Sequence, residues 1–180
     1  MHKTEVILVN DADEAIGTME KIEAHKKALL HRAFSVFIFN SKGEMLLHQR
    51  SFGKYHSAGL WTNACCSHPL PGEEIRSAAE RRLKEEMGFI TGLEEIFSFI
   101  YKVELGDLTE HEFDHVFAGI YDGNICHNTE EVLQHQYLSI EKIEKWLANQ
   151  PEDFTVWFKL AFPTVKGWWL KRFIGPDRIA

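Results

Sequence analysis

The sequence has no long apolar run and few cysteines. Its apolar stretches fall well short of the roughly 20 residues that a membrane-spanning helix needs, so we expect no membrane partner. The N-terminal run Val6–Val9 is ended by Asn10, too early for the core of a secretory signal, and we therefore expect a cytoplasmic protein. Three cysteines are an odd number, and in a reducing compartment they favour thiol chemistry or metal binding over disulfides.

Positive charge is also scarce. Lysine and arginine total 20 against 27 acidic residues, a formal net charge of −7 that argues against a nucleic-acid partner. A local basic cluster or a bound metal would still allow an anionic small-molecule substrate. The sequence contains no internal repeat, low-complexity tract or flexible linker, and 44% of its residues are hydrophobic. We therefore expect a single domain over residues 1–180.

The order of apolar and turn residues predicts strands around a central helix. A strand and a polar turn are expected within 5–18, and further strand-like runs lie at 33–39, 45–48, 60–68, 96–104 and 113–121. The turn at 40–43 predicts that 33–39 and 45–48 form a hairpin. No glycine-rich dinucleotide fingerprint follows a strand, so this order favours an α/β sandwich over a doubly wound sheet.

The clearest helix follows Pro71-Gly72, where apolar residues recur at helical spacing from Ile75 to Met87. Glu73 and Glu74 are expected in its first turn, and Gly88 is expected just after its end. The tail from residue 140 also has helical patterns, which we expect prolines 151 and 163 to interrupt.

The tripeptide Cys66-Ser67-His68 lies in a segment expected to be extended. Alternate side chains share one face of such a segment, so Cys66 and His68 point one way and Cys65 points the other. A thiol beside an imidazole can take part in proton transfer. The alternative is that both cysteines are small core residues.

A second group is Glu110-His111-Glu112, immediately before the predicted strand at 113–121. Spacing by two places both carboxylates on one face, where they repel unless a cation or a shared proton lies between them. The alternative is a solvated acidic turn.

Two histidines precede the first long strand-like run. His25 and His31 are about 240° apart around an ideal helix, so they can bind one metal only if the chain between them is irregular. Otherwise they are surface histidines. We interpret the remaining histidines outside the His68 tripeptide as surface or framework residues: His48, His56, His111, His115, His127 and His135.

The helix 75–87 carries Glu85 and Glu86 near its end, where carboxylates are unfavourable for the helix dipole. They are either paired with Arg81 and Arg82, four residues earlier, or used to bind a cation.

The segment from Ser67 to Phe89 resembles the Nudix box, a loop–helix–loop that binds a divalent cation and a diphosphate. The matching residues are Glu73, Arg81, Leu83, Glu85, Glu86, Gly88 and Phe89. Ser67 stands where the box opens with glycine, and Arg82 stands where a metal-binding glutamate is expected. The resemblance implies a Nudix-like α/β/α sandwich with a mixed central sheet, while Arg82 puts ordinary pyrophosphate hydrolysis in doubt.

Three further segments resemble the type 1 isopentenyl diphosphate isomerases: 30–37, 61–69 and 110–112. The similarity runs from about Gly17 to Phe117. It implies metal-dependent isomerisation of isopentenyl to dimethylallyl diphosphate, through protonation, a carbocation-like intermediate and deprotonation, in isoprenoid precursor biosynthesis. It also implies a small-molecule substrate, no flavin, and a monomer or weak dimer.

By this resemblance Cys66 and Glu112 are the acid–base pair. Glu112, helped by Tyr101, is expected to deliver the proton and Cys66 to accept one, although the sequence leaves the reverse assignment open. The three-histidine, two-glutamate metal site, suited to Mn²⁺, Zn²⁺ or Mg²⁺, matches His25, His31, His68, Glu110 and Glu112.

The same resemblance places Glu86 as a ligand of a second Mg²⁺ that touches the diphosphate. The basic positions around the diphosphate match Lys21, Arg50, Lys54 and Arg82. Trp157 either offers its ring face to the carbocation or is a core residue. The alternatives are a Nudix pyrophosphohydrolase acting on a small diphosphate and a catalytically silent binding module.

Overall fold

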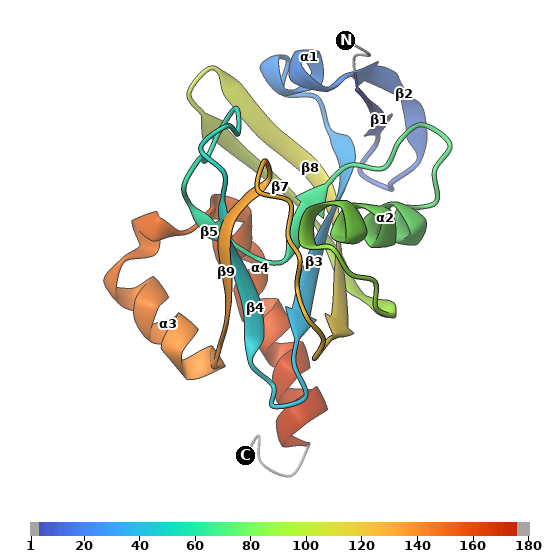
Figure 1. Ribbon diagram of the computed structural model, residues 1–180. Coiled ribbons are helices and arrows are strands. Elements are labelled where there is room, and N and C mark those ends of the chain that lie inside the picture. The colour runs from blue at the N-terminus through green and yellow to red at the C-terminus, as the bar shows by residue number, and fades with distance from the viewer. Residues whose placement is uncertain (1–3, 176–180) are drawn as a thin grey trace.

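The computed structural model describes residues 4–175 and contains one mixed nine-stranded sheet. Helix α2 lies on one face of the sheet and α4 on the other (Figure 1). The strands are β1 Glu5–Val9, β2 Ala15–Glu20, β3 His31–Phe39, β4 Met45–Arg50, β5 Trp61–Thr62, β6 Cys65–Ser67, β7 Leu93–Leu105, β8 Leu108–Ile120 and β9 Val132–Leu138. The helices are α1 Lys21–Lys26, α2 Ile75–Met87, α3 Ile140–Asn149 and α4 Val156–Trp169, with a 3₁₀ turn at Pro151–Asp153 and a π-helical turn at Leu170–Ile174. The predicted α/β/α sandwich with a mixed sheet is confirmed.

Strand β3 is the centre of the sheet. It pairs in parallel with β8 over its whole length and antiparallel with β1, β4 and β6. Its alternate residues serve both cores: Phe34 and Val36 pack on the α2 side, whereas Phe37 and Phe39 pack on the α4 side. Burial on both faces explains why this strand is a nearly continuous apolar run rather than an alternating one.

The predicted hairpin between β3 and β4 forms only at its turn. The two strands pair at Phe39 and Met45 and then separate, β3 toward β6 and β8, and β4 toward β5 and β9. The sequence also did not predict β9. Glu110 and Glu112 lie inside β8, not before it, because β7 and β8 form a long antiparallel hairpin that extends beyond the apolar run.

The helix α2 ends where the sequence predicted, and Gly88 follows it in the left-handed conformation at φ 81°. The expectation that two glutamates lie in its first turn was wrong. Glu74 is the N-cap, and its carboxylate accepts from two backbone N–H groups. Glu73 lies outside the helix and accepts two hydrogen bonds from Arg81.

Pro163 does not interrupt α4, contrary to the sequence prediction. Its ring lies on the exposed side, so the carbonyl four residues earlier loses its N–H partner where water can replace it. The opposite side is held by buried Phe158, Ala161, Phe162 and Val165. Within residues 4–175, no helix combines the length and the apolar character that crossing a membrane requires.

Candidate active site

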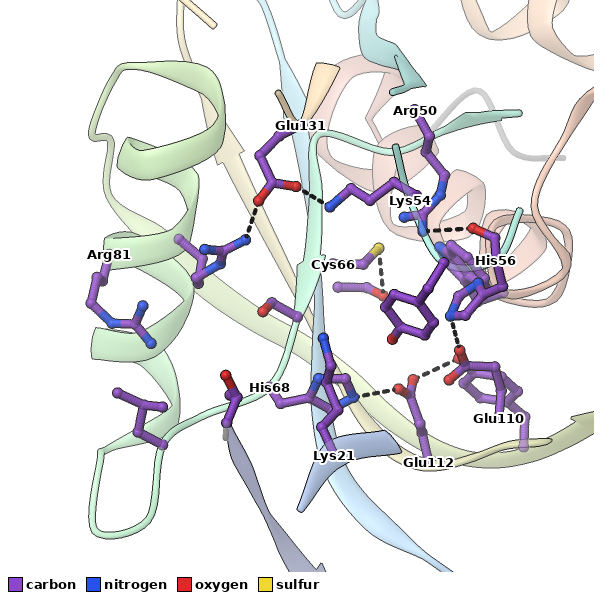
Figure 2. Close-up of a pocket in the computed structure, with 18 residues that line it drawn as sticks. Lys21, Arg50, Lys54, His56, Cys66, His68, Arg81, Glu110, Glu112 and Glu131 are labelled. Atoms are coloured by element: carbon purple, nitrogen blue, oxygen red, sulfur yellow. Dashed lines mark hydrogen bonds and ion pairs between the residues drawn. The ribbon is translucent and has the colours of Figure 1, made fainter. Parts of the chain in front are cut away.

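A cavity of about 350 Å³ opens at the end of the sheet where β3 and β8 begin. Side chains from both strands, from β6, β7 and α2, and from the β4–β5 loop point into it (Figure 2). Ten residues that the sequence proposed for the site line it: Lys21, Arg50, Lys54, Cys66, His68, Arg82, Tyr101, Glu110, Glu112 and Trp157. His25 and His31 lie fully buried beside it.

The register of β3 and β8 brings imidazole and carboxylate together, because His31 is paired with Glu112. His25 comes from α1, which ends at Lys26, and the chain then turns through Ala28 at φ 53°. This irregular segment allows the rings of His25 and His31 to approach to 4.7 Å between centroids. One nitrogen or oxygen each from His25, His31, His68 and Glu112 lies within 4.8 Å of the other three.

The hydrogen bonds of two histidines set the direction of their lone pairs. Nδ1 of His25 lies 2.7 Å from the Lys21 carbonyl, and Nδ1 of His31 lies 2.8 Å from the Leu29 carbonyl. A carbonyl only accepts, so in each neutral ring Nδ1 carries the proton and Nε2 carries the lone pair.

Both Nε2 atoms are buried, and neither has a hydrogen-bond partner among the described residues. Their nearest charged neighbours are the carboxylates of Glu110 at 3.3 Å and Glu112 at 3.7 Å. A cation placed between lone pairs and carboxylates that converge in a buried space stabilises both. The ligand set therefore fits a divalent metal ion.

Glu112 has two further partners. Its Oε2 accepts a 2.6 Å hydrogen bond from the hydroxyl of Tyr101, its direct cross-strand neighbour on β7, and its Oε1 lies 2.8 Å from Nε2 of His68. Burial, followed by the charge of Glu112, raises the pKa of Tyr101 well above its ordinary value. Tyr101 therefore remains a hydrogen-bond donor at neutral pH.

Cys66 lies in β6, opposite Ser35 of β3. Its sulfur is 3.1 Å from Oδ1 of Asn63 and 3.4 Å from Oγ of Ser35, whose hydroxyl donates to buried Asp114 at 2.8 Å. Burial, with a contribution from Asp114, raises the pKa of the Cys66 thiol to about 12. Cys65 points the other way, into the core beneath α2, so the two cysteines face opposite sides as alternation predicted.

Basic side chains also line the cavity. Lys54 pairs with Glu131, and Arg82 reaches the same carboxylate at 3.4 Å. Lys21 lies over the ring of Tyr55 at 4.6 Å. Burial lowers the pKa of Lys21, and the nearby charges of Lys54 and Arg82 lower it further. This crowding of positive charge favours an anionic ligand.

Arg50 and Trp157 are tied together at the cavity wall. The guanidinium of Arg50 donates to the carbonyls of His56 and Ser57, both at 3.1 Å, and lies 5.1 Å from the ring centroid of Trp157. The indole of Trp157 donates to Thr62 at 3.0 Å, which fixes the plane of the ring.

Glu86 does not line the cavity. It is 3% exposed, in the last turn of α2, and its carboxylate is bonded by Arg82. The sequence had allowed this pairing as one of two uses of the carboxylate.

Sequence reasoning missed several residues of the site. The sequence offered no pattern that joins His56 to the site, yet its side chain is 9% exposed and its Nε2 lies 2.6 Å from Oε1 of Glu110. No local spacing signals this contact, which depends on how the β4–β5 loop folds back. Ser35, Asn63, Asp114 and Glu131 were also missed.

Comparisons with known proteins agree with this architecture. The NUDIX domain model matches residues 29–158. A solved structure from Deinococcus radiodurans superposes with a TM-score of 0.68 at 18% identity, covering 81% of this chain and 90% of that one. The MutT protein of Methanosarcina mazei gives 0.61 at 22% identity, covering 83% and 96%. The fold and the site therefore define a Nudix domain.

Curated relatives resolve the family within this superfamily. An isopentenyl-diphosphate Delta-isomerase of Serratia proteamaculans is 51% identical, covering 85% of this chain and 86% of the relative. The protein of the same name from Pectobacterium atrosepticum is 48% identical, covering 94% of this chain and 95% of the relative. That from Burkholderia multivorans is 46% identical, covering 85% of this chain and 88% of the relative. The chain belongs to the isopentenyl-diphosphate Delta-isomerase family, as the sequence motifs predicted.

Proposed function

We propose that this protein isomerises isopentenyl diphosphate to dimethylallyl diphosphate for isoprenoid biosynthesis. The observation that carries the proposal is the shared cavity: a thiol, a carboxylate with a tyrosine donor, and a cluster of basic side chains all line it. The reaction adds a proton at one carbon of the substrate and removes one from another, so it needs an acid and a base. It also needs the diphosphate to be held and kept intact.

Binding of the diphosphate falls to Lys21, Arg50, Lys54 and Arg82. Their heads converge on the cavity from four separate elements, and Glu131 orients two of them. Trp157 would face the positive charge that develops on the carbon skeleton, with its ring held by Thr62.

Proton transfer falls to Glu112 and Cys66. In the first assignment Glu112, assisted by Tyr101, delivers the proton and Cys66 accepts one. The 2.6 Å bond supports it, because a tyrosine hydroxyl stabilises the carboxylate left after proton transfer.

The reverse assignment rests on the surroundings of Cys66. Both Asn63 amide hydrogens are donated to backbone carbonyls, so its Oδ1 faces the sulfur as an acceptor. The Ser35 hydroxyl is donated to Asp114, so its oxygen can only accept from the thiol. These neighbours favour an S–H group, which would make Cys66 the acid and Glu112 the base.

His25, His31, His68, Glu110 and Glu112 would hold the divalent cation, and their mixed nitrogen and oxygen atoms suit Mn²⁺, Zn²⁺ or Mg²⁺. When bound, the cation neutralises the paired carboxylates and tunes the acidity of Glu112. Glu86 remains our proposed ligand for a substrate-linked Mg²⁺, which requires its carboxylate to open its contact with Arg82.

We further propose that residues 1–180 act as a single Nudix-fold isomerase domain in the cytoplasm, as a monomer or weak dimer. Support comes from the continuous sheet and from the net charge of −7, which disfavours nucleic-acid and anionic-membrane partners.

The test is incubation with isopentenyl diphosphate and Mg²⁺, with and without Mn²⁺ or Zn²⁺, in deuterated water. Deuterium entering the allylic product without phosphate release supports the isomerase. Release of phosphate would instead support the pyrophosphohydrolase, and binding with neither reaction would support the silent module.

A further inference from the structure

The β4–β5 loop, residues 51–60, places one histidine against the proposed metal site. The side chain of His56 is nine-tenths buried, whereas Phe52 and Tyr55 on the same loop are exposed. Its Nε2 atom is buried and has no hydrogen-bond partner among the described residues, although it lies 2.6 Å from Oε1 of Glu110. Figure 2 shows His56 and Glu110 facing each other at the rim of the cavity.

The same signature marks His25 and His31, whose Nε2 atoms are also buried and unpartnered. The carboxylates beside these three Nε2 atoms are therefore not aligned to form hydrogen bonds with them. His56 differs in one respect. Within residues 4–175 no carbonyl fixes its Nδ1, which lies 3.4 Å from the Ser57 hydroxyl.

Two groups of potential ligands overlap at His25. One contains His31, His68 and Glu112, and the other contains His56 and Glu110, with the ligand atoms of each group within 4.8 Å of one another. Because Nδ1 of His25 is engaged by the Lys21 carbonyl, only its Nε2 is available, and one imidazole nitrogen binds one cation. The two groups therefore share the one available nitrogen of His25, so a cation bound there lies next to both groups.

The distances from Glu110 to His25 and His56 fit shared coordination. Metal–nitrogen and metal–oxygen bonds of about 2.1 Å place neighbouring ligands roughly 3 Å apart. Glu110 lies 2.6 Å from Nε2 of His56 and 3.3 Å from Nε2 of His25.

We propose that His56 is a further protein ligand of the cation, in addition to the three histidines and two glutamates. The inference rests on the proposed metal site and adds to it a ligand carried by a loop. That loop also carries Lys54, and its carbonyls at residues 56 and 57 accept from Arg50. The cation thereby fixes the loop that presents two of the diphosphate-binding side chains, so metal loading prepares the anion site.

The test compares wild type with His56→Ala and with the control His127→Ala, which removes a histidine that does not line the cavity. Mn²⁺ alone is the probe, and its affinity is measured from the free-ion EPR signal. Because loss of an outer-shell partner alone weakens metal binding roughly 10- to 100-fold, we expect His56→Ala to weaken Mn²⁺ binding at least that much and His127→Ala to match wild type.

Ligand identity is read separately by pulsed EPR on protein labelled with ¹⁵N-histidine. The variant should lose one coupled imidazole nitrogen. Hydrogen exchange gives a third readout: Mn²⁺ should slow exchange in residues 51–60 of wild type but not of His56→Ala. If the alanine variant does not fold, His56→Gln keeps the volume without the imidazole and must show the same loss.

The outcomes separate the two proposals. If wild type does not bind Mn²⁺, the proposed metal site is wrong, and the proposal for His56 is wrong with it. Tight binding in both proteins with an unchanged nitrogen count overturns only the role of His56. Weaker binding with an unchanged count also overturns it, because a hydrogen bond to Glu110 alone would have that effect.

Discussion

Replacing Tyr101 with phenylalanine tests the proton-transfer pair most directly. Tyr101 is 7% exposed, and its hydroxyl donates to Glu112 at 2.6 Å. The change removes one oxygen and keeps the ring, which packs against Phe99 at 5.5 Å between centroids. It therefore isolates a single hydrogen bond to a carboxylate.

The expected magnitude follows from the type of bond. A hydrogen bond to a charged group contributes about 1.5–3 kcal/mol. If Tyr101 stabilises the carboxylate that forms as Glu112 gives up its proton, the bond strengthens in the transition state. The loss then falls on kcat and amounts to roughly 10- to 150-fold, while KM for isopentenyl diphosphate stays near wild type.

The assay is steady-state isomerisation, with thermal unfolding to check stability. Tyr137→Phe is the matched control, because its hydroxyl donates to a neutral carbonyl of Tyr121 at 2.7 Å, outside the cavity lining. A Tyr101→Phe enzyme with kcat within twofold of wild type would refute the reasoning. It would mean that the bond is equally strong before and during proton transfer.

Three other predictions follow from the same geometry. Cys66→Ala should abolish isomerisation with little change in unfolding, whereas Cys65→Ala should retain activity because Cys65 faces the core beneath α2. Loss of activity in both variants would contradict the assignment of proton transfer to Cys66. Burial raises the pKa of Cys66 to about 12, so its thiolate forms only above ordinary pH, and iodoacetamide at pH 7–8 should alkylate it more slowly than exposed Cys126. The rate at Cys66 should rise steeply with pH when each site is followed by peptide mass spectrometry, and faster labelling of Cys66 than of Cys126 would indicate a resting thiolate. Gly88→Ala should lower the free energy of unfolding by roughly 1–3 kcal/mol or more, because φ is 81° and an added Cβ would lie 2.3 Å from the Cys126 carbonyl oxygen. Gly72→Ala, at φ 80° with open space, should cost only the conformational strain, and equal losses of the two variants in denaturant unfolding would show that the clash relaxes.

Features set by neighbouring residues could be predicted from the sequence, and features set by distant pairing could not. The presence of α2 and its end follow from apolar spacing and from Gly88, and the opposite facing of Cys65 and Cys66 follows from strand alternation. The separation of β3 from β4 after their turn is decided by what else each strand can pair with, namely β8 and β9. His56 belongs to the same class, since a loop of irregular backbone carries no periodic signal.

The helix α2 shows how the box that binds metal in other Nudix proteins can serve a different reaction. Arg82 stands where a metal-binding glutamate is expected, and it is held by the carboxylates of Glu85, Glu86 and Glu131. These acidic side chains therefore orient a cation of the protein toward the cavity. The ligand set that fits a metal ion instead comes from the start of β3 and β8 and from α1, beside Glu112. A hydrolase needs its metal at the bond to be broken, whereas an isomerase must hold the diphosphate intact while protons move on the carbon skeleton. In our proposal, fixed positive side chains and a substrate-linked Mg²⁺ hold the diphosphate, and the three-histidine, two-glutamate ligands lie at the proposed acid–base carboxylate, Glu112, which suits the second requirement.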